Sequence, residues 1–136
     1  MSDYQLIERI PTVTEFCDLR RFSGLTPKSP EAAALGLPNT IHAVVIEHQG
    51  ETIGMGRVIG DGGTVYQLTD IAVLAAHRGK GLGKRIVAAL VDWLQANAPK
   101  GAYVSLIADG PAKDLYAQYG FEETAPASVG MSMWVR

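Results

Sequence analysis

The feature that most constrains this chain is a strand, a glycine-rich turn and a helix in direct succession between Thr64 and Asn97. The run TVYQLTDIAVL is dominated by residues that favour β-structure, which predicts a largely buried strand. After the turn AAHRGKGLGKR, apolar residues recur at Leu82, Ile86 and Leu90, and this spacing predicts an amphipathic helix that ends near Asn97. The succession predicts part of a strand–helix–strand unit within an α/β sheet.

Three glycines in the turn, Gly79, Gly81 and Gly83, indicate a phosphate-binding site. Glycine has no Cβ, so its backbone amides can approach a ligand closely. The first turn of the next helix offers unpaired N–H groups and the positive end of the helix dipole. Cationic side chains add to the attraction at Arg78, Lys80, Lys84 and Arg85. The alternative is a glycine-rich helix entrance without a ligand.

Two common phosphate-binding patterns are excluded. The P-loop pattern requires a glycine where Arg78 stands and a serine or threonine where Arg85 stands. The dinucleotide pattern G-x-G-x-x-G requires its third glycine at Lys84, and it usually opens a domain, whereas this turn follows half of the chain. The turn therefore indicates a phosphate-binding site of another kind.

The segment RGKGLG (Arg78–Gly83) matches Arg/Gln-x-x-Gly-x-Gly/Ala, a signature of the GNAT superfamily of acyl-CoA-dependent N-acetyltransferases, and the chain resembles that family. Ala112 with DLYAQYGF (Asp114–Phe121) is similar to a second signature, A-x-x-L-Y-x-x-x-G-F. Asp109 stands where many members carry asparagine. The expected element order, β-α-α-β-β-β-α-β-α-β-β, is that of the family over nearly the whole chain.

The remaining segments predict a single domain over residues 1–136. Besides the central strand, strands are expected at Tyr4–Arg9, Thr40–His48, Thr52–Ile59, Ala102–Ala108, Phe121–Thr124 and Met131–Val135. Besides the long helix, helices are expected from Thr12 or Thr14 to about Ser23, from Pro30 to Gly36, and from Pro111 to about Tyr119. The resemblance implies an α/β (α+β) fold with a mixed sheet of six to seven strands, a splayed parallel pair and about four helices.

Composition excludes several classes of function. The net charge of −2 gives no general attraction to nucleic acid or to an anionic membrane. Neither a signal peptide nor a membrane span is recognisable, so the cytoplasm is the expected location. The single cysteine, Cys17, cannot form an internal disulfide, and its apolar setting predicts a core thiol rather than a catalytic nucleophile. No metal site is expected.

The resemblance implies acetyl-CoA as co-substrate. In the family the two central parallel strands part, and the pantetheine arm pairs with the freed backbone, here that of Ile71, Ala72 and Val73. The diphosphate is expected on the main chain of the glycine turn. The complete expected set for acetyl-CoA is Ile71, Ala72, Val73, Arg78, Gly79, Lys80, Gly81, Leu82, Gly83, Lys84, Asp109 and Tyr116.

Direct attack of a neutral amine on a thioester requires a stabilised oxyanion, an acid for the leaving thiolate and a route for the amine proton. The backbone amide of Val73 is expected to stabilise the oxyanion. Tyr116 lies where the family often has its general acid, although its helical spacing also fits a core aromatic residue. Gln67, where some members carry glutamate, would relay the proton through a water. Asp70 is either a base or a buried structural carboxylate.

Strand alternation places Gln67, Thr69 and Ile71 on one face and Leu68, Asp70 and Ala72 on the other, unless a bulge changes the register.

The function expected from the resemblance is acetylation of a primary amine on a small molecule. The alternatives are acetylation of a protein or peptide, at its N-terminus or at lysine, and a CoA-binding sensor without turnover. A homodimer is a possible assembly that the sequence does not determine.

Overall fold

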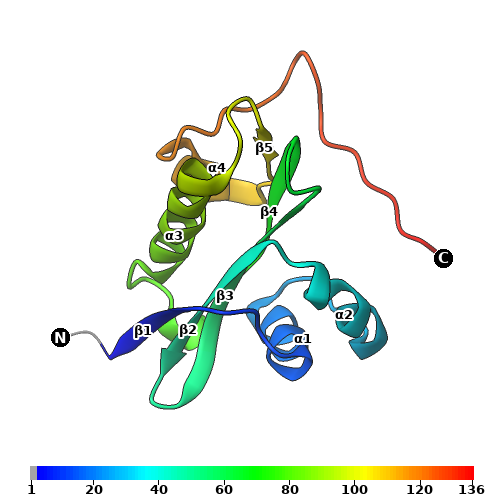
Figure 1. Ribbon diagram of the computed structural model, residues 1–136. Helices are drawn as coiled ribbons and strands as arrows, with labels where there is room; N and C mark the ends of the chain where they lie inside the picture. Colours follow the sequence, from blue (N-terminus) through cyan, green and yellow to red (C-terminus); the bar gives the residue numbers. More distant parts are fainter. Residues whose placement is uncertain (1–2) are drawn as a thin grey trace. The chain divides into compact units, whose positions relative to one another are not determined.

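Figure 1 shows the computed structural model, which describes residues 3–136. The chain forms two compact units, one up to Leu106 and the other comprising Ile107–Arg136. The expectation of a single domain stays a prediction, and the two units are described in turn.

The first unit is built on one sheet of five strands in the order β1-β2-β3-β4-β5. The first four strands pair antiparallel with one another. β5 pairs parallel with β4, as predicted for the strands on either side of the long helix. The strands are β1 (Tyr4–Glu8), β2 (His42–His48), β3 (Glu51–Gly60), β4 (Val65–Val73) and β5 (Tyr103–Ser105).

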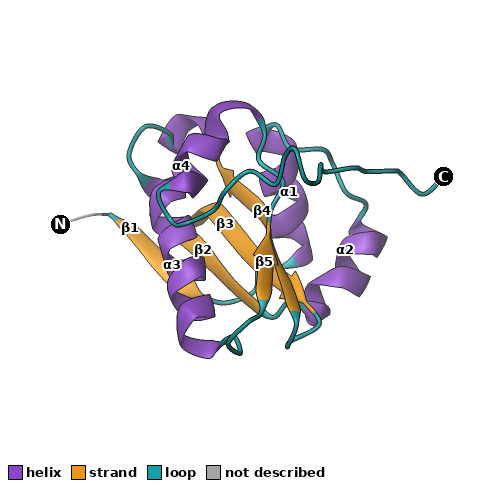
Figure 2. Ribbon diagram, turned by 90° about the horizontal axis from the view of Figure 1, so that it is seen from above, coloured by secondary structure: helices purple, strands orange, loops and turns teal. Residues whose placement is uncertain are grey.

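Helices cover both faces of this sheet. Figure 2 shows α3 (Leu82–Asn97) on one face, and α1 (Val13–Ser23) and α2 (Pro30–Gly36) on the other. The bounds of α3 agree with the prediction. Thr12 and Glu15 form a capping box at the start of α1, and the Ser29 hydroxyl caps α2, so both starts follow from local sequence. Two short 3₁₀ turns were not predicted, η1 (Leu37–Asn39) and η2 (Ala75–His77).

The core lies between the sheet and these helices. On the face of α1 and α2, Phe16 and Leu19 pack with Met55 and Ala72, and Cys17 lies partly buried against this cluster. On the other face, α3 presents the fully buried side chains of Ile86 and Leu90. The close approach of α3 depends on Gly56 in β3, because a Cβ there would lie 2.5 Å from Ile86 Cγ2.

Replacing Gly56 with alanine is therefore expected to destabilise the protein by about 1–3 kcal/mol, because the extra methyl group overpacks a filled core. Gly36 in α2 is the matched control, since a Cβ there would meet no heavy atom within 4 Å. Denaturant unfolding of both variants measures the difference. Equal stabilities for the two variants would contradict the packing argument.

The prediction of six to seven strands was wrong. The sheet has five strands, and residues 121–136, all of which the structure describes, contain no strand. The expected strands at Phe121–Thr124 and Met131–Val135 are irregular instead. A strand requires ladder hydrogen bonds with a neighbouring chain segment, and a local sequence pattern does not specify that neighbour.

The second unit contains a 3₁₀ turn, η3 (Gly110–Ala112), followed by α4 (Lys113–Ala117). The predicted helix is present but shorter than Pro111–Tyr119. Its Tyr116 ring packs edge-on against Phe121, with centroids 6.1 Å apart. Among residues 3–136, none of the helices has the length and apolar character needed to cross a membrane.

Candidate functional site

The candidate site begins where β4 and β5 part. The two strands pair only from Val65 to Gln67 on β4, because β5 ends at Ser105. β4 itself continues to Val73, still paired on its other edge with β3. Residues 68–73 of β4 therefore present one edge without a strand partner in the sheet. Such an edge can accept an extended, amide-rich ligand.

Val73 places its backbone groups on this open edge. The N–H of Leu74 donates to Ile53 O at 2.9 Å, toward β3. Backbone N–H groups alternate in direction along an extended strand, so the N–H of Val73 points away from β3. The carbonyl of Val73 points the same way and accepts a hydrogen bond from Arg78 Nε at 3.0 Å. The N–H of Val73 therefore points to the open edge, and its role as an oxyanion donor stays a prediction.

A bulge in β4 lies next to this edge. Met55 on β3 pairs with Ala72 on β4, and Arg57 on β3 pairs with Thr69 on β4. An advance of two residues along β3 therefore corresponds to three residues along β4, which is one extra residue on β4. Asp70, at the bulge, has a φ of 59°.

The bulge changes the expected alternation of β4. A Cβ on Gly56 would point toward Ile86 of α3 and would lie 3.4 Å from Ile71 Cγ1, so Ile71 also faces α3. Ala72 packs on the opposite side, with the cluster of α1. Leu68 pairs with Val58, two residues beyond Gly56, and so also faces α3. The prediction that Leu68 and Ala72 share one face was therefore wrong, and so was the grouping of Gln67, Thr69 and Ile71 that follows from the same count.

The glycine turn lies between η2 and α3, immediately after the open edge. Gly79 and Gly81 have φ values of 78° and 76°, the left-handed region that favours glycine. A Cβ at Gly79, Gly81 or Gly83 would meet no heavy atom within 4 Å, so the space above the turn is open. Gly81 is the N-cap of α3 and no side chain caps the helix, which leaves its first N–H groups directed outward. The turn has the backbone geometry that phosphate binding requires, and its binding of the diphosphate stays a prediction.

Arg78 is held in place by the protein itself. Its Nη2 donates to Ser23 O at 2.6 Å, at the end of α1, while its Nε donates to Val73 O. The Arg78 side chain thus joins α1 to the end of β4 in front of the turn. Arg78 was expected on the diphosphate, and its contacts indicate that its side chain positions the turn. Lys80 and Lys84 lie exposed on the turn and the first turn of α3.

Asp70 lies in a buried ion-pair cluster. Its Oδ1 accepts from Arg20 Nη1 at 2.5 Å and its Oδ2 from Arg57 Nη1 at 2.7 Å. All three side chains are nearly inaccessible to solvent. Of the two alternatives for Asp70, these contacts favour a structural carboxylate. Neither arginine was predicted from the sequence, although a carboxylate inside a buried strand signals that a cation must lie nearby.

Gln67 lies at the last β4–β5 pair, opposite Ser105, and is partly exposed. It therefore lies where the strands part, which suits a residue that positions a water. Tyr116 and Asp109 lie in the second unit. There burial, together with the carboxylate of Asp109, raises the pKa of the Tyr116 phenol above its ordinary value.

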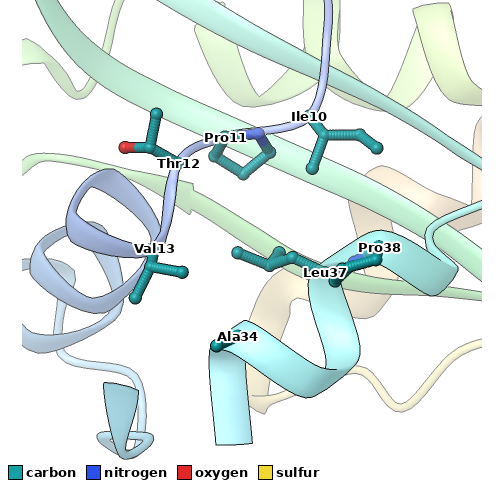
Figure 3. A pocket seen from close by; sticks show the side chains of 7 residues that line it. All are labelled: Ile10, Pro11, Thr12, Val13, Ala34, Leu37 and Pro38. Carbon is teal, nitrogen blue, oxygen red and sulfur yellow. The ribbon is translucent and has the colours of Figure 1, made fainter. Parts of the chain in front are cut away.

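An apolar hollow of about 330 Å³ lies between the segment that enters α1 and the end of α2. Figure 3 shows the side chains around it: Ile10, Pro11, Thr12, Val13, Ala34, Leu37 and Pro38. Thr12 is the polar residue of this set, and its hydroxyl already accepts the N–H of Glu15. The hollow offers a surface for apolar contact without a free catalytic group.

Comparisons with known proteins agree with this geometry. The family model described as Acetyltransferase (GNAT) domain matches residues 39–123. A protein of unknown function from meticillin-resistant Staphylococcus aureus, described as a probable acetyltransferase, is 43% identical over 97% of this chain and 99% of its own, with a TM-score of 0.92.

Two further solved structures share the fold at lower identity. A GNAT-family acetyltransferase from Streptococcus pneumoniae is 18% identical, covers 98% of both chains and has a TM-score of 0.76. Glucosamine-6-phosphate N-acetyltransferase from Arabidopsis thaliana is 20% identical over 97% of this chain and 99% of its own, with a TM-score of 0.70. No curated protein matches the chain.

Proposed function

The chain belongs to the GNAT family of acyl-CoA N-acyltransferases, and we propose that it transfers the acetyl group of acetyl-CoA directly to a primary amine of a small molecule. The observation that carries the proposal is the open edge of β4, which ends at the glycine turn with the N–H of Val73 directed outward. A thioester arm along this edge and a diphosphate on the turn would be held by adjacent parts of one main-chain segment.

Acetyl-CoA fits the residues present. The outward N–H groups at the start of α3, with the open space over Gly79, Gly81 and Gly83, suit its diphosphate. Residues Ile71–Val73 offer backbone groups to its pantetheine amides. When bound, acetyl-CoA supplies the thioester carbonyl that the amine attacks.

The reaction forms one C–N bond and breaks the C–S bond. The amine gives up a proton, and the leaving thiolate takes one. The N–H of Val73 stabilises the negative charge that develops on the carbonyl oxygen. A water held by Gln67 accepts the amine proton, because glutamine cannot accept it itself.

Tyr116 is the proposed acid. A tyrosine phenol is protonated at neutral pH, so Tyr116 can donate its proton to the thiolate as the C–S bond breaks and then regain one from solvent. Its raised pKa keeps the phenol protonated to a higher pH. Asp109 contributes through its charge, since the carboxylate disfavours ionisation of the phenol.

Replacing Tyr116 with phenylalanine is expected to lower kcat about 10²-fold, at the low end of the range for a general acid, because thiolate is a competent leaving group. The affinity for CoA should not change. In the unmodified enzyme the rate should fall as the pH rises through the raised pKa of Tyr116. Unchanged turnover, measured while thiol release limits the rate, would remove the acid role.

The acceptor class and the presence of turnover are tested together. The protein is incubated with acetyl-CoA and with amines, lysine-containing peptides and peptides with free N-termini, while free thiol is followed. Turnover on small amines supports the proposal, and turnover on peptides alone identifies a protein acetyltransferase. CoA binding without thiol release above hydrolysis across the panel identifies a sensor.

We propose the cytoplasm as the location, since a chain with one cysteine forms no internal disulfide.

A further inference from the structure

The cluster around Asp70 carries an unbalanced positive charge. Arg20 and Arg57 are 9% and 8% exposed, and the single carboxylate between them, Asp70, is 8% exposed. Among residues 3–136, no other carboxylate forms an ion pair with either arginine. Two buried cations and one buried anion leave a net charge of +1. A buried charge without a counterion is costly, so this cluster favours a further anion.

Arg57 retains hydrogen-bonding capacity for such an anion. A guanidinium has five N–H donors. Three hydrogen bonds of the Arg57 side chain occur within the described residues: Nε to Thr40 Oγ1 at 2.9 Å, Nη1 to Asp70 Oδ2 at 2.7 Å and Nη2 to Gly36 O at 3.4 Å. The last of these bonds is long and readily exchanged. Donors on Arg57 therefore remain available for a ligand.

Arg57 lines a cavity of about 90 Å³ on the side of the sheet that α1 and α2 cover. Its guanidinium carbon lies 5.6 Å from the centroid of the Phe16 ring, and both Phe16 and Gly36 border the same cavity. Lys28 brings a second cationic residue to the lining, and the other residues are apolar or small: Ala32, Ala33 and Leu37. The cavity combines cations with apolar walls and no carboxylate.

The cavity is linked to β4 through Arg57. Asp70, which binds Arg57, directly precedes the Ile71–Val73 edge. A group bound to Arg57 would therefore lie beside the bulge of β4. We infer that the cavity binds a carboxylate of the acceptor, so that the substrate is an amino acid or a similar molecule carrying an amine and a carboxylate.

The assignment rests on the proposed function, because it specifies the acceptor of that reaction. A carboxylate suits the site better than a larger phosphate: it is planar, it matches the fork of a guanidinium, and the cavity has room for only a few water-sized groups. The amine would extend from the cavity toward the open edge of β4.

Matched acceptors test the inference on the unmodified enzyme. Glycine, β-alanine and 4-aminobutyrate are each compared with the corresponding amide and aminoalkylphosphonate, at saturating acetyl-CoA, by thiol release. For the best chain length, kcat/KM is expected to be at least about 10-fold higher for the carboxylate than for the amide, the worth of one charge-assisted hydrogen bond. Equal rates for acid and amide, or a preference for the phosphonate, would overturn it.

A binding measurement separates this inference from the proposed function. Butyrate and butyramide, neither of which has an amine, are titrated while the Nε–H resonance of Arg57 is followed by NMR. A saturable shift of this resonance with butyrate, and none with butyramide, supports the carboxylate site even if no amine is acetylated. The absence of a response to butyrate overturns the site even in an active acetyltransferase.

Variants complete the test. Arg57→Lys keeps the charge and loses the fork, and it is expected to reduce the preference for acid over amide about 10-fold, with its folding checked by thermal unfolding. Lys28→Gln leaves the buried ion pairs intact and should reduce the preference less. Lys100→Gln, at an exposed lysine beyond α3, is the control and should leave the preference unchanged. An unchanged preference in both Arg57→Lys and Lys28→Gln contradicts the assignment.

Discussion

Replacing Gly81 with valine is expected to lower the affinity for CoA about 10³-fold, the equivalent of two charge-assisted hydrogen bonds of about 2 kcal/mol each. Gly81 has a φ of 76°, which a β-branched residue strongly resists, so the start of α3 must shift and carry its N–H groups with it. The valine side chain would also enter the open space above the turn. Calorimetric titration with CoA measures the loss.

Gly83 provides the matched control. A Cβ at Gly83 would also enter open space, but Gly83 lies within α3 at an ordinary helical position, and the family signature accepts alanine there. Gly83→Ala is expected to raise stability by up to about 1 kcal/mol and to leave the affinity for CoA nearly unchanged. Lys80→Ala, which removes a side-chain charge and no amide, should weaken binding far less than Gly81→Val. Wild-type affinity in Gly81→Val would exclude the turn as the diphosphate site.

Replacing Asp70 with asparagine is expected to lower the free energy of unfolding by about 3–5 kcal/mol, because it leaves Arg20 and Arg57 buried without a counterion. Asparagine has the shape of aspartate and tolerates the left-handed conformation that residue 70 adopts, so the change isolates the charge. Denaturant unfolding followed by circular dichroism measures the difference in stability.

Asp92→Asn is the control for this prediction, since Asp92 lies exposed on α3 and its replacement should change stability by no more than about 0.5 kcal/mol. The experiment also decides between the two roles of Asp70. A structural carboxylate predicts a large loss of stability. A general base predicts wild-type stability with loss of turnover, and that outcome would overturn the structural assignment.

Most of the secondary structure could be predicted because its signals are local. α3 was predicted with its observed bounds from the spacing of Leu82, Ile86 and Leu90, and the start of α2 from its capping residue. For α1 two capping residues were expected as alternatives, Thr12 and Thr14, and the structure has Thr12. The glycine turn was predicted from residue types, since left-handed backbone favours glycine. The elements that were wrong are those that depend on a partner: the last two strands, and the alternation of β4 across its bulge.

The sequence by itself determined the family, the order of the elements from β1 to α4, and the position of the glycine turn before α3, because these depend on residue type and short-range spacing. The tertiary structure decided which groups of β4 reach the open edge and what Asp70 does. Asp70 binds Arg20, 50 residues away in the chain, and Arg57, 13 residues away. Such pairs form only when distant segments pack together, because a buried charge takes whichever partner the fold brings within hydrogen-bonding distance.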